Sequence, residues 1–144
     1  MKLKVITNSS FAETLVKIYT DCIDSKTQYL IDFIQHDYND IQGFWRGELH
    51  LIKSDDIVRV YTDGKKIVIE TTYKTYTSKQ RLYQLEERLP SNFIKLSQGE
   101  IANIYQIHKL DLNIKGTVKV TFKTGQISFV SRRSIKSVKK ALGI

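Results

Sequence analysis

The sequence has few of the residues that most catalytic or metal sites need. Its 144 residues include one cysteine, Cys22, and three histidines that lie far apart, at positions 36, 50 and 108. One cysteine allows no internal disulfide, and scattered histidines do not supply the close ligand set of a zinc site. A Gly-rich phosphate loop, a Gly-x-Ser-x-Gly motif and a dinucleotide fingerprint are also absent. We therefore expect no enzyme, no metal and no cofactor.

Long hydrophobic runs are missing as well. No apolar stretch approaches the roughly 18 residues that cross a bilayer. Residues 1–10 contain lysines but lack the apolar segment of a signal peptide. With one proline and no repeat or Gly-rich linker, the chain is expected to be one domain with a small appendage. These absences predict a cytoplasmic protein that does not insert into a membrane.

Acidic residues are scarce in one part of the chain only. Residues 1–90 carry 13 Lys and Arg against 13 Asp and Glu, whereas residues 91–144 carry 10 against 2. From position 112 to the end there are 8 basic residues and no acidic one. The net charge of +8 therefore lies in the C-terminal part, and it indicates a polyanionic partner, for which nucleic acid fits better than a membrane.

The basic C-terminus has the pattern of a helix. Ser131 is a candidate N-cap and Gly143 a candidate end, and an apolar stripe runs between them at Ile135, Val138 and Leu142. Arg132 and Arg133 would then occupy the first turn, where the helix dipole disfavours cations by roughly 0.3–1 kcal/mol. A bound phosphate would offset this cost, whereas a merely solvated basic face would not.

The remaining chain predicts an α+β fold that is mainly antiparallel β. A short strand at residues 2–6 and two helices, opened by the capping boxes Ser10/Glu13 and Ser25/Gln28, are expected to pack against a β-rich middle. Thr62-Asp63-Gly64 predicts a hairpin turn, and Ser78 is the expected cap of a helix with a leucine stripe that ends at Pro90. Residues 117–130 predict a second hairpin with one core face and one basic face.

Three stretches resemble the LytTR family of DNA-binding domains: "SDDIVRVYTDGKKIVIETT", "RLYQLEERLPSNFIKLSQGEIANIYQIHKL" and "GTVKVTFKTGQISFVSRRSIKSVKKAL". The resemblance covers residues 43–144 and leaves residues 1–42 as an N-terminal extension with a packing or interaction role. It implies an elongated set of small antiparallel β-sheets with flanking helices, which reads the DNA major groove through loops.

The resemblance also implies the residues that contact DNA. By position, Arg133 would contact a base edge, and Gln98 and Lys66 would occupy two further base-contacting positions. Some family members have asparagine and histidine at these two positions, so this chain departs from them in length or charge. Implied contacts to the DNA backbone are Arg132, Lys65, Lys95, Ser97 and Lys136.

The partners implied by the resemblance are double-stranded DNA with repeated half-sites and a homodimer on that DNA. Some 42 residues precede the matching region, too few for a receiver domain. The resemblance is therefore to short members that are controlled by abundance or by a regulatory partner protein, sometimes a membrane protein. Three other functions are considered from the residues alone. Two stay open: an RNA or single-strand binder, and a protein-interaction module with nonspecific polyanion affinity. For the third, a small-molecule sensor or enzyme, the sequence shows no pocket chemistry.

Overall fold

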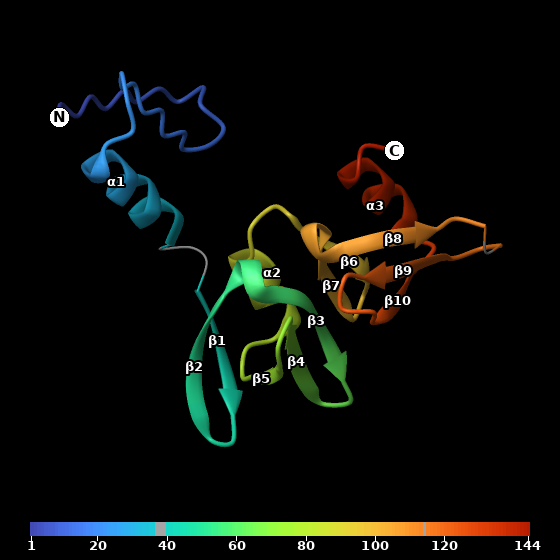
Figure 1. Ribbon diagram of the computed structural model, residues 1–144. Helices are drawn as coiled ribbons and strands as arrows, with labels where there is room; N and C mark the ends of the chain where they lie inside the picture. The colour runs from blue at the N-terminus through green and yellow to red at the C-terminus, as the bar shows by residue number, and fades with distance from the viewer. Residues whose placement is uncertain (37–39, 114) are drawn as a thin grey trace.

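The computed structural model describes residues 1–36, 40–113 and 115–144, and within them ten strands form two antiparallel sheets (Figure 1). The strands are β1 (Asp40–Trp45), β2 (Glu48–Lys53), β3 (Ile57–Asp63), β4 (Lys66–Thr71), β5 (Thr75–Ser78), β6 (Phe93–Ser97), β7 (Glu100–Asn103), β8 (Ile107–Asp111), β9 (Val118–Phe122) and β10 (Ile127–Val130). The helices are α1 (Ser25–His36), α2 (Leu82–Arg88) and α3 (Ile135–Ala141), with short 3₁₀ turns η1 (Ser54–Asp56) and η2 (Ile104–Gln106).

Neighbouring strands are mostly hairpin partners. The larger sheet has the order β2-β1-β5-β4-β3-β7-β6, and the smaller one has the order β10-β9-β8. All pairs are antiparallel. The expected class, α+β and mainly antiparallel β, is confirmed.

The turn between β3 and β4 forms as its sequence predicts. Asp63 pairs with Lys66, so Gly64 and Lys65 make a two-residue connection. Gly64 has φ of 62°, which the first position of a type II′ hairpin turn requires and which glycine adopts without a steric penalty. This places Lys65 at the tip of the hairpin.

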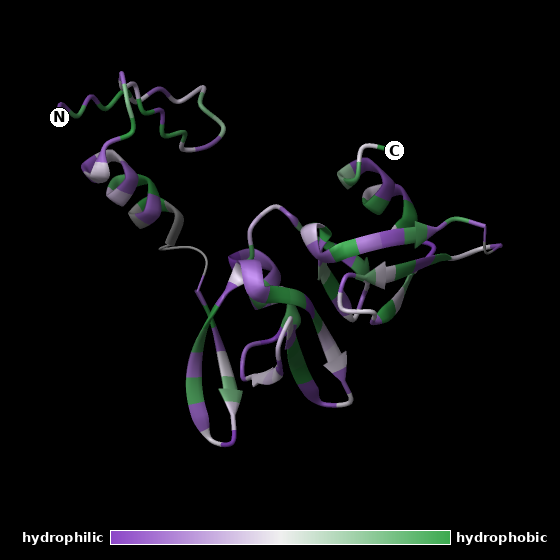
Figure 2. Cartoon of the chain, in the orientation of Figure 1, coloured by the Kyte–Doolittle hydropathy of each residue, from purple (hydrophilic) through white to green (hydrophobic). Residues whose placement is uncertain are grey.

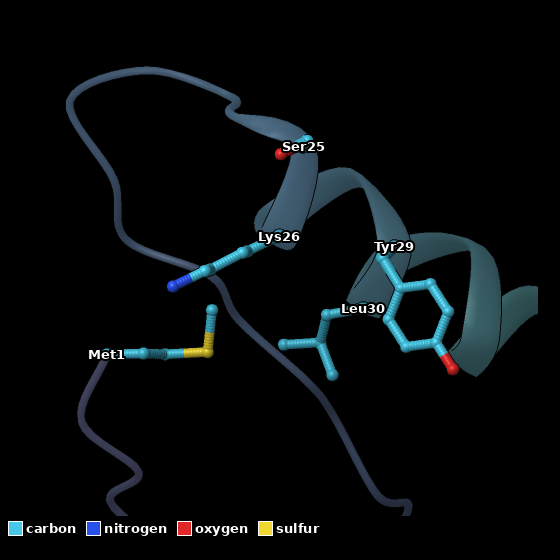
Figure 3. Close-up of a pocket in the computed structure, with 5 residues that line it drawn as sticks. All are labelled: Met1, Ser25, Lys26, Tyr29 and Leu30. Carbon is cyan, nitrogen blue, oxygen red and sulfur yellow. The ribbon is translucent and has the colours of Figure 1, made fainter.

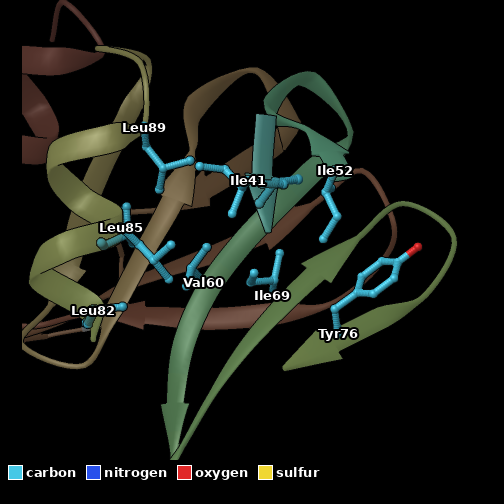
Figure 4. Packing of buried hydrophobic residues seen from close by; sticks show 10 residues of the cluster. Ile41, Ile52, Val60, Ile69, Tyr76, Leu82, Leu85 and Leu89 are labelled. Carbon is cyan, nitrogen blue, oxygen red and sulfur yellow. The ribbon is translucent and has the colours of Figure 1, made fainter. Parts of the chain in front are cut away.

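The larger hydrophobic core lies between the seven-stranded sheet and α2 (Figure 4). Leu82, Leu85 and Leu89 of the expected stripe are all buried in it. The expected cap at Ser78 is wrong, because Ser78 pairs with Ile67 as the last residue of β5. The helix starts after Arg81 instead, whose N–H donates to the Gln84 side chain at 2.9 Å.

A second core joins the three-stranded sheet to α3 and to the end of the larger sheet. Val58, Leu96 and Ala102 of the larger sheet belong to the same cluster as the buried residues of β9, β10 and α3. The apolar stripe of α3 is confirmed, with Val138 buried and its two companions partly buried. The outer face of the hairpin is less basic than expected. Its register places Ile127 opposite Thr121 and Phe129 opposite Lys119, so both apolar side chains are exposed.

The start of α3 differs from the prediction. Ser134, not Ser131, precedes the first helical residue. The N–H of Ser131 donates to Leu96 O at 2.8 Å, which fixes Ser131 against β6, and its own carbonyl accepts from Ser134 N at 2.9 Å. Arg132 and Arg133 therefore lie in a turn before the helix and not in its first turn.

The N-terminal extension forms one helix where a strand and two helices were expected. Residues 1–24 contain neither helix nor strand, and all of them are exposed, so the expected packing on the β region is absent from this segment. Helix α1 is present, but its cap is Asp24, whose Oδ1 accepts from Thr27 N at 2.8 Å. This hydrogen bond lowers the pKa of the Asp24 carboxyl. None of the helices in the described ranges has the length and apolar content needed to cross a bilayer.

Candidate nucleic-acid interface

Three connecting segments of the β region are tied together by backbone hydrogen bonds. They are the Gly64-Lys65 turn, the turn after β6 that contains Gln98 and Gly99, and residues 131–134 before α3. Gly99 O accepts from Thr62 N at 2.9 Å, which links the first two segments. The bond from Ser131 N to Leu96 O links the third segment to β6. The three segments are therefore connected through β3 and β6, and together they are called the loop edge below.

A hollow with a basic lining lies beside the first two segments of the loop edge. It is bounded by the β3–β4 turn, the connection from β5 to α2, and β6. Its charged lining residues are all cations: Lys65, Lys79, Arg81 and Lys95. Because no carboxylate lines it, the hollow favours an anion over a neutral ligand. Glu86 reaches Lys95 from α2 at 3.8 Å, a distance and exposure at which an ion pair contributes little.

Five of the eight expected DNA contacts lie on the first two segments or in the hollow. Lys65, Lys95 and Gln98 line the hollow, and Lys66 is the exposed first residue of β4 next to it. Ser97 ends β6, and its Oγ accepts from Gly99 N at 3.4 Å, a contact that helps to shape the turn.

The other three expected contacts follow β10. Arg132 and Arg133 are exposed in the turn before α3, and Lys136 is exposed on α3. The guanidinium of Arg132 lies beside Gly116, since a Cβ there would come within 3.4 Å of its Nη2. Within the described part of the chain, Arg133 has no hydrogen bond or ion pair, so its fork is available to a ligand.

Two cations of the hollow were missed in the sequence. Lys79 and Arg81 lie between β5 and α2, and the pattern there only predicts a helix start. The structure brings them beside Lys65 because β5 pairs with β4. Lys79 Nζ also lies 4.5 Å from the ring centroid of Phe44. The only signal in the sequence was that these basic residues directly follow a strand, β5, that pairs with the β3–β4 hairpin.

A buried ionic network supports the loop edge from behind. Arg59 of β3 donates to Glu70 through Nε at 2.7 Å and to Glu100 through Nη1 at 3.1 Å. Burial lowers the pKa of Arg59, but the hydrogen bonds to the two carboxylates outweigh it and raise the pKa overall. Glu100 also accepts from the Ser128 hydroxyl of the smaller sheet. The network thus joins the two sheets next to the Gln98-Gly99 turn.

Comparisons with known proteins show what the chain is similar to. The model of the LytTr DNA-binding domain family matches residues 47–143. An uncharacterized HTH-type transcriptional regulator of Staphylococcus aureus strain NCTC 8325 is 31% identical over 150 residues, an alignment that covers 100% of this chain and 99% of that protein. A regulator with the same description from strain MRSA252 matches equally well, at 31% identity and the same coverage.

A solved structure has the same fold. It is the LytTr DNA-binding domain of a Bacillus cereus protein described as a methyl-accepting/DNA response regulator, with a TM-score of 0.70 and 20% identity. The match covers 74% of this chain and 98% of that domain. The family model and the full-length relatives confirm the resemblance seen in the sequence.

The loop edge lies on small antiparallel sheets, and the charged residues that line its hollow are all cations, which suits a polyanionic ligand. The chain belongs to the LytTR family of DNA-binding domains. It carries a LytTR DNA-binding domain, and the two full-length relatives named above are described as transcriptional regulators. The HTH label of the relatives does not describe this arrangement, because strands separate each helix from the next within the described ranges.

Proposed function

We propose that the chain recognises a specific sequence in double-stranded DNA by placing the loop edge in the major groove. The observation that carries this proposal is the hydrogen-bonded connection of the three segments, from Thr62 to Gly99 and from Leu96 to Ser131. A set of loops held in fixed relation can contact several base pairs in register, which separate mobile loops cannot do.

The side chains divide by chemistry into base readers and backbone contacts. Arg133 has an unoccupied planar fork that suits guanine O6 and N7, a contact worth about 1–3 kcal/mol of discrimination. Gln98 is exposed on its turn and offers an amide that can pair with adenine N6 and N7. Lys66, the exposed first residue of β4, contacts either a base or a phosphate in this proposal.

The remaining contacts go to phosphates. Lys65 and Lys95 share the hollow, whose lining contains no carboxylate. The Glu86 carboxylate, 3.8 Å from Lys95 Nζ, is a weak competitor for a phosphate oxygen at this exposure. Arg132, Lys136 and the Ser97 hydroxyl extend this backbone contact toward α3. Such contacts set the register of the protein on DNA without reading its sequence.

Two protomers act on repeated half-sites in this proposal. One loop edge is small, and specific affinity at physiological salt usually requires an interface of about 1,000 Å² or more of protein surface. We further propose that the protein works in the bacterial cytoplasm and that a partner protein, soluble or membrane-bound, sets its activity.

The test is a selection of bound sequences from a random duplex library at about 150 mM salt, where nonspecific binding is weak. A repeated motif with half-sites one or two helical turns apart is the expected result. Arg133→Ala should lose discrimination against altered sites, whereas Lys136→Ala should weaken all sites alike and lower the salt slope by about one unit. Equal losses on specific and random DNA for both variants would contradict the assigned roles, and preference for single strands would contradict duplex recognition.

A further inference from the structure

Residues 1–36 hold a large share of the exposed apolar surface. Of the 20 large hydrophobic side chains that are exposed in the described residues, 11 belong to this quarter of the chain. Figure 2 shows hydrophobic segments, in green, along the extension, which is set apart from both sheets. Apolar surface concentrated in this way marks an interaction site and not a random surface composition.

The pattern within this segment is that of an amphipathic helix. Seven residues of the stretch 11–23 would share one face of a helix, and they are Phe11, Leu15, Val16, Ile18, Tyr19, Cys22 and Ile23. At 100° per residue they span an arc of roughly 160°. The polar side chains Glu13, Thr14, Lys17, Thr20 and Asp21 all fall on the opposite face.

This helix does not form in the single chain. Residues 11–23 are irregular, with Phe11 59% exposed and Leu15 69% exposed. An isolated helix of this length is marginal in water, since its stability comes from packing of the apolar face. The segment therefore encodes a helix but lacks the surface on which to form it.

A pocket lies beside the neighbouring helix α1. Figure 3 shows Met1 over the side of α1 that carries Tyr29 and Leu30. Met1 is itself 88% exposed. The exposed apolar side chains of residues 11–23 are thus available to a partner.

We propose that this partner is the same segment of a second copy of the chain, and that residues 11–23 become helical when two copies associate. Residues 1–36 carry four lysines and four carboxylates, a net charge of zero, whereas the rest of the chain carries +8. Two neutral segments can meet without the repulsion that opposes contact between the basic domains. A neutral segment also offers no charge that would select a strongly basic or acidic partner.

The apolar area that residues 11–23 could bury is close to that of a standard protein interface. Six large apolar side chains on the arc, two aromatic and four aliphatic, would bury on the order of 700 Å² per protomer. A standard protein interface buries about 800 Å² per partner. The segment lies outside the matched DNA-binding region, residues 47–143, so self-association would leave the loop edge free in each copy. Self-association does not depend on the proposed function. Only the purpose of the dimer does, which is to present two loop edges to DNA.

The test measures mass and helix content of the full chain without DNA. Sedimentation velocity from about 1 to about 100 μM, where interfaces of this size associate, should show a monomer–dimer equilibrium, and the circular dichroism at 222 nm should rise with the dimer fraction. Leu15→Glu/Ile18→Glu should abolish both changes. The matched control, Thr14→Glu/Thr20→Glu, adds the same charge on the polar face and should dimerise within threefold of the wild-type chain.

A second variant separates packing from helix propensity. Leu15→Ala/Ile18→Ala removes apolar area while introducing the best helix former, so a dissociation constant at least about tenfold weaker is expected. The melting temperature of the β region is measured for every variant as a control. It should not change, which verifies that the DNA-binding domain remains folded.

Several results would overturn the inference. They are a wild-type chain that stays monomeric throughout, a helix signal independent of concentration, or equal dimerisation of all variants. A monomer that still selects a DNA motif would overturn self-association alone, whereas a dimer that selects no motif would overturn only the DNA recognition.

Discussion

The side chain of Asn103 donates a hydrogen bond through Nδ2 to the backbone oxygen of Ile57 at 2.9 Å. Its Oδ1 accepts from Asn92 Nδ2 at 2.8 Å and from Tyr105 N at 3.0 Å. Asn103 is 1% exposed, so one buried amide holds the ends of β3, β6 and β7 in register. These strands carry the first two segments of the loop edge.

Replacement of Asn103 should destabilise the domain more than its size suggests. In Asn103→Ala the buried Ile57 carbonyl loses its partner, which costs about 1–3 kcal/mol. The Asn92 amide and the Tyr105 N–H, both only partly buried, lose theirs as well. We expect the free energy of unfolding in urea to fall by about 2–4 kcal/mol. Asn113→Ala, an exposed site, serves as the control and should change it by less than about 0.5 kcal/mol. Equal midpoints for the two variants would contradict this role.

Removal of Arg59 should lower the free energy of unfolding more than removal of Asn103. Arg59→Ala leaves Glu70 and Glu100 without their cation, and their side chains are only 12% and 13% exposed. Breaking a buried ion pair by removing one partner typically costs about 3–5 kcal/mol. Thermal unfolding should show this loss, while Lys109→Ala on the exposed face of β8 should leave the midpoint near that of the wild type. A loss below about 1 kcal/mol would show that solvent replaces the arginine.

Gly43 of β1 should not tolerate a side chain. A Cβ at this position would lie 2.5 Å from Ile52 Cδ1 and 2.9 Å from Tyr76 Cβ. The methyl end of Ile52 can move, but the Tyr76 Cβ is held by the backbone of β5. Gly43→Ala should therefore lower stability by about 1–3 kcal/mol, the usual cost of overpacking. Denaturant unfolding measures it, and an unchanged midpoint would mean that β1 shifts freely against β5.

Lys79 and Arg81 should contribute to DNA affinity without contributing to sequence preference. If both contact phosphates, Lys79→Ala/Arg81→Ala should lower the slope of log affinity against log salt by about two units. The control is Lys17→Ala/Lys26→Ala, which removes the same charge from the extension and should leave the slope unchanged. Fluorescence anisotropy on one duplex at several salt concentrations measures both. Equal slopes for the two double variants would remove the hollow from the DNA interface.

Local patterns predicted much of the fold. The leucine stripe of α2 and the apolar stripe of α3 lie where their spacing placed them, because buried positions of a helix repeat every three or four residues whatever its neighbours are. The Gly64 turn also formed as predicted, since the backbone angle that it needs is a property of glycine itself.

Starting points of helices were less predictable. Ser78 and Ser131 both have the side chain of an N-cap, yet one pairs in β5 and the other is held by Leu96 O. A serine caps a helix only if its backbone is not already engaged elsewhere, and that depends on distant strands. The same reasoning applies to residues 11–23, where the helical pattern is present and the packing surface is not.

The sequence by itself determined the α+β class, the basic C-terminal half and the family, because composition, local periodicity and motif order are properties of short stretches of chain. Only the tertiary structure decided which loops meet. The contacts from Thr62 to Gly99 and from Leu96 to Ser131, and the position of Lys79 and Arg81 beside Lys65, join residues far apart in the chain. They arise from strand pairing and core packing, which local patterns do not encode.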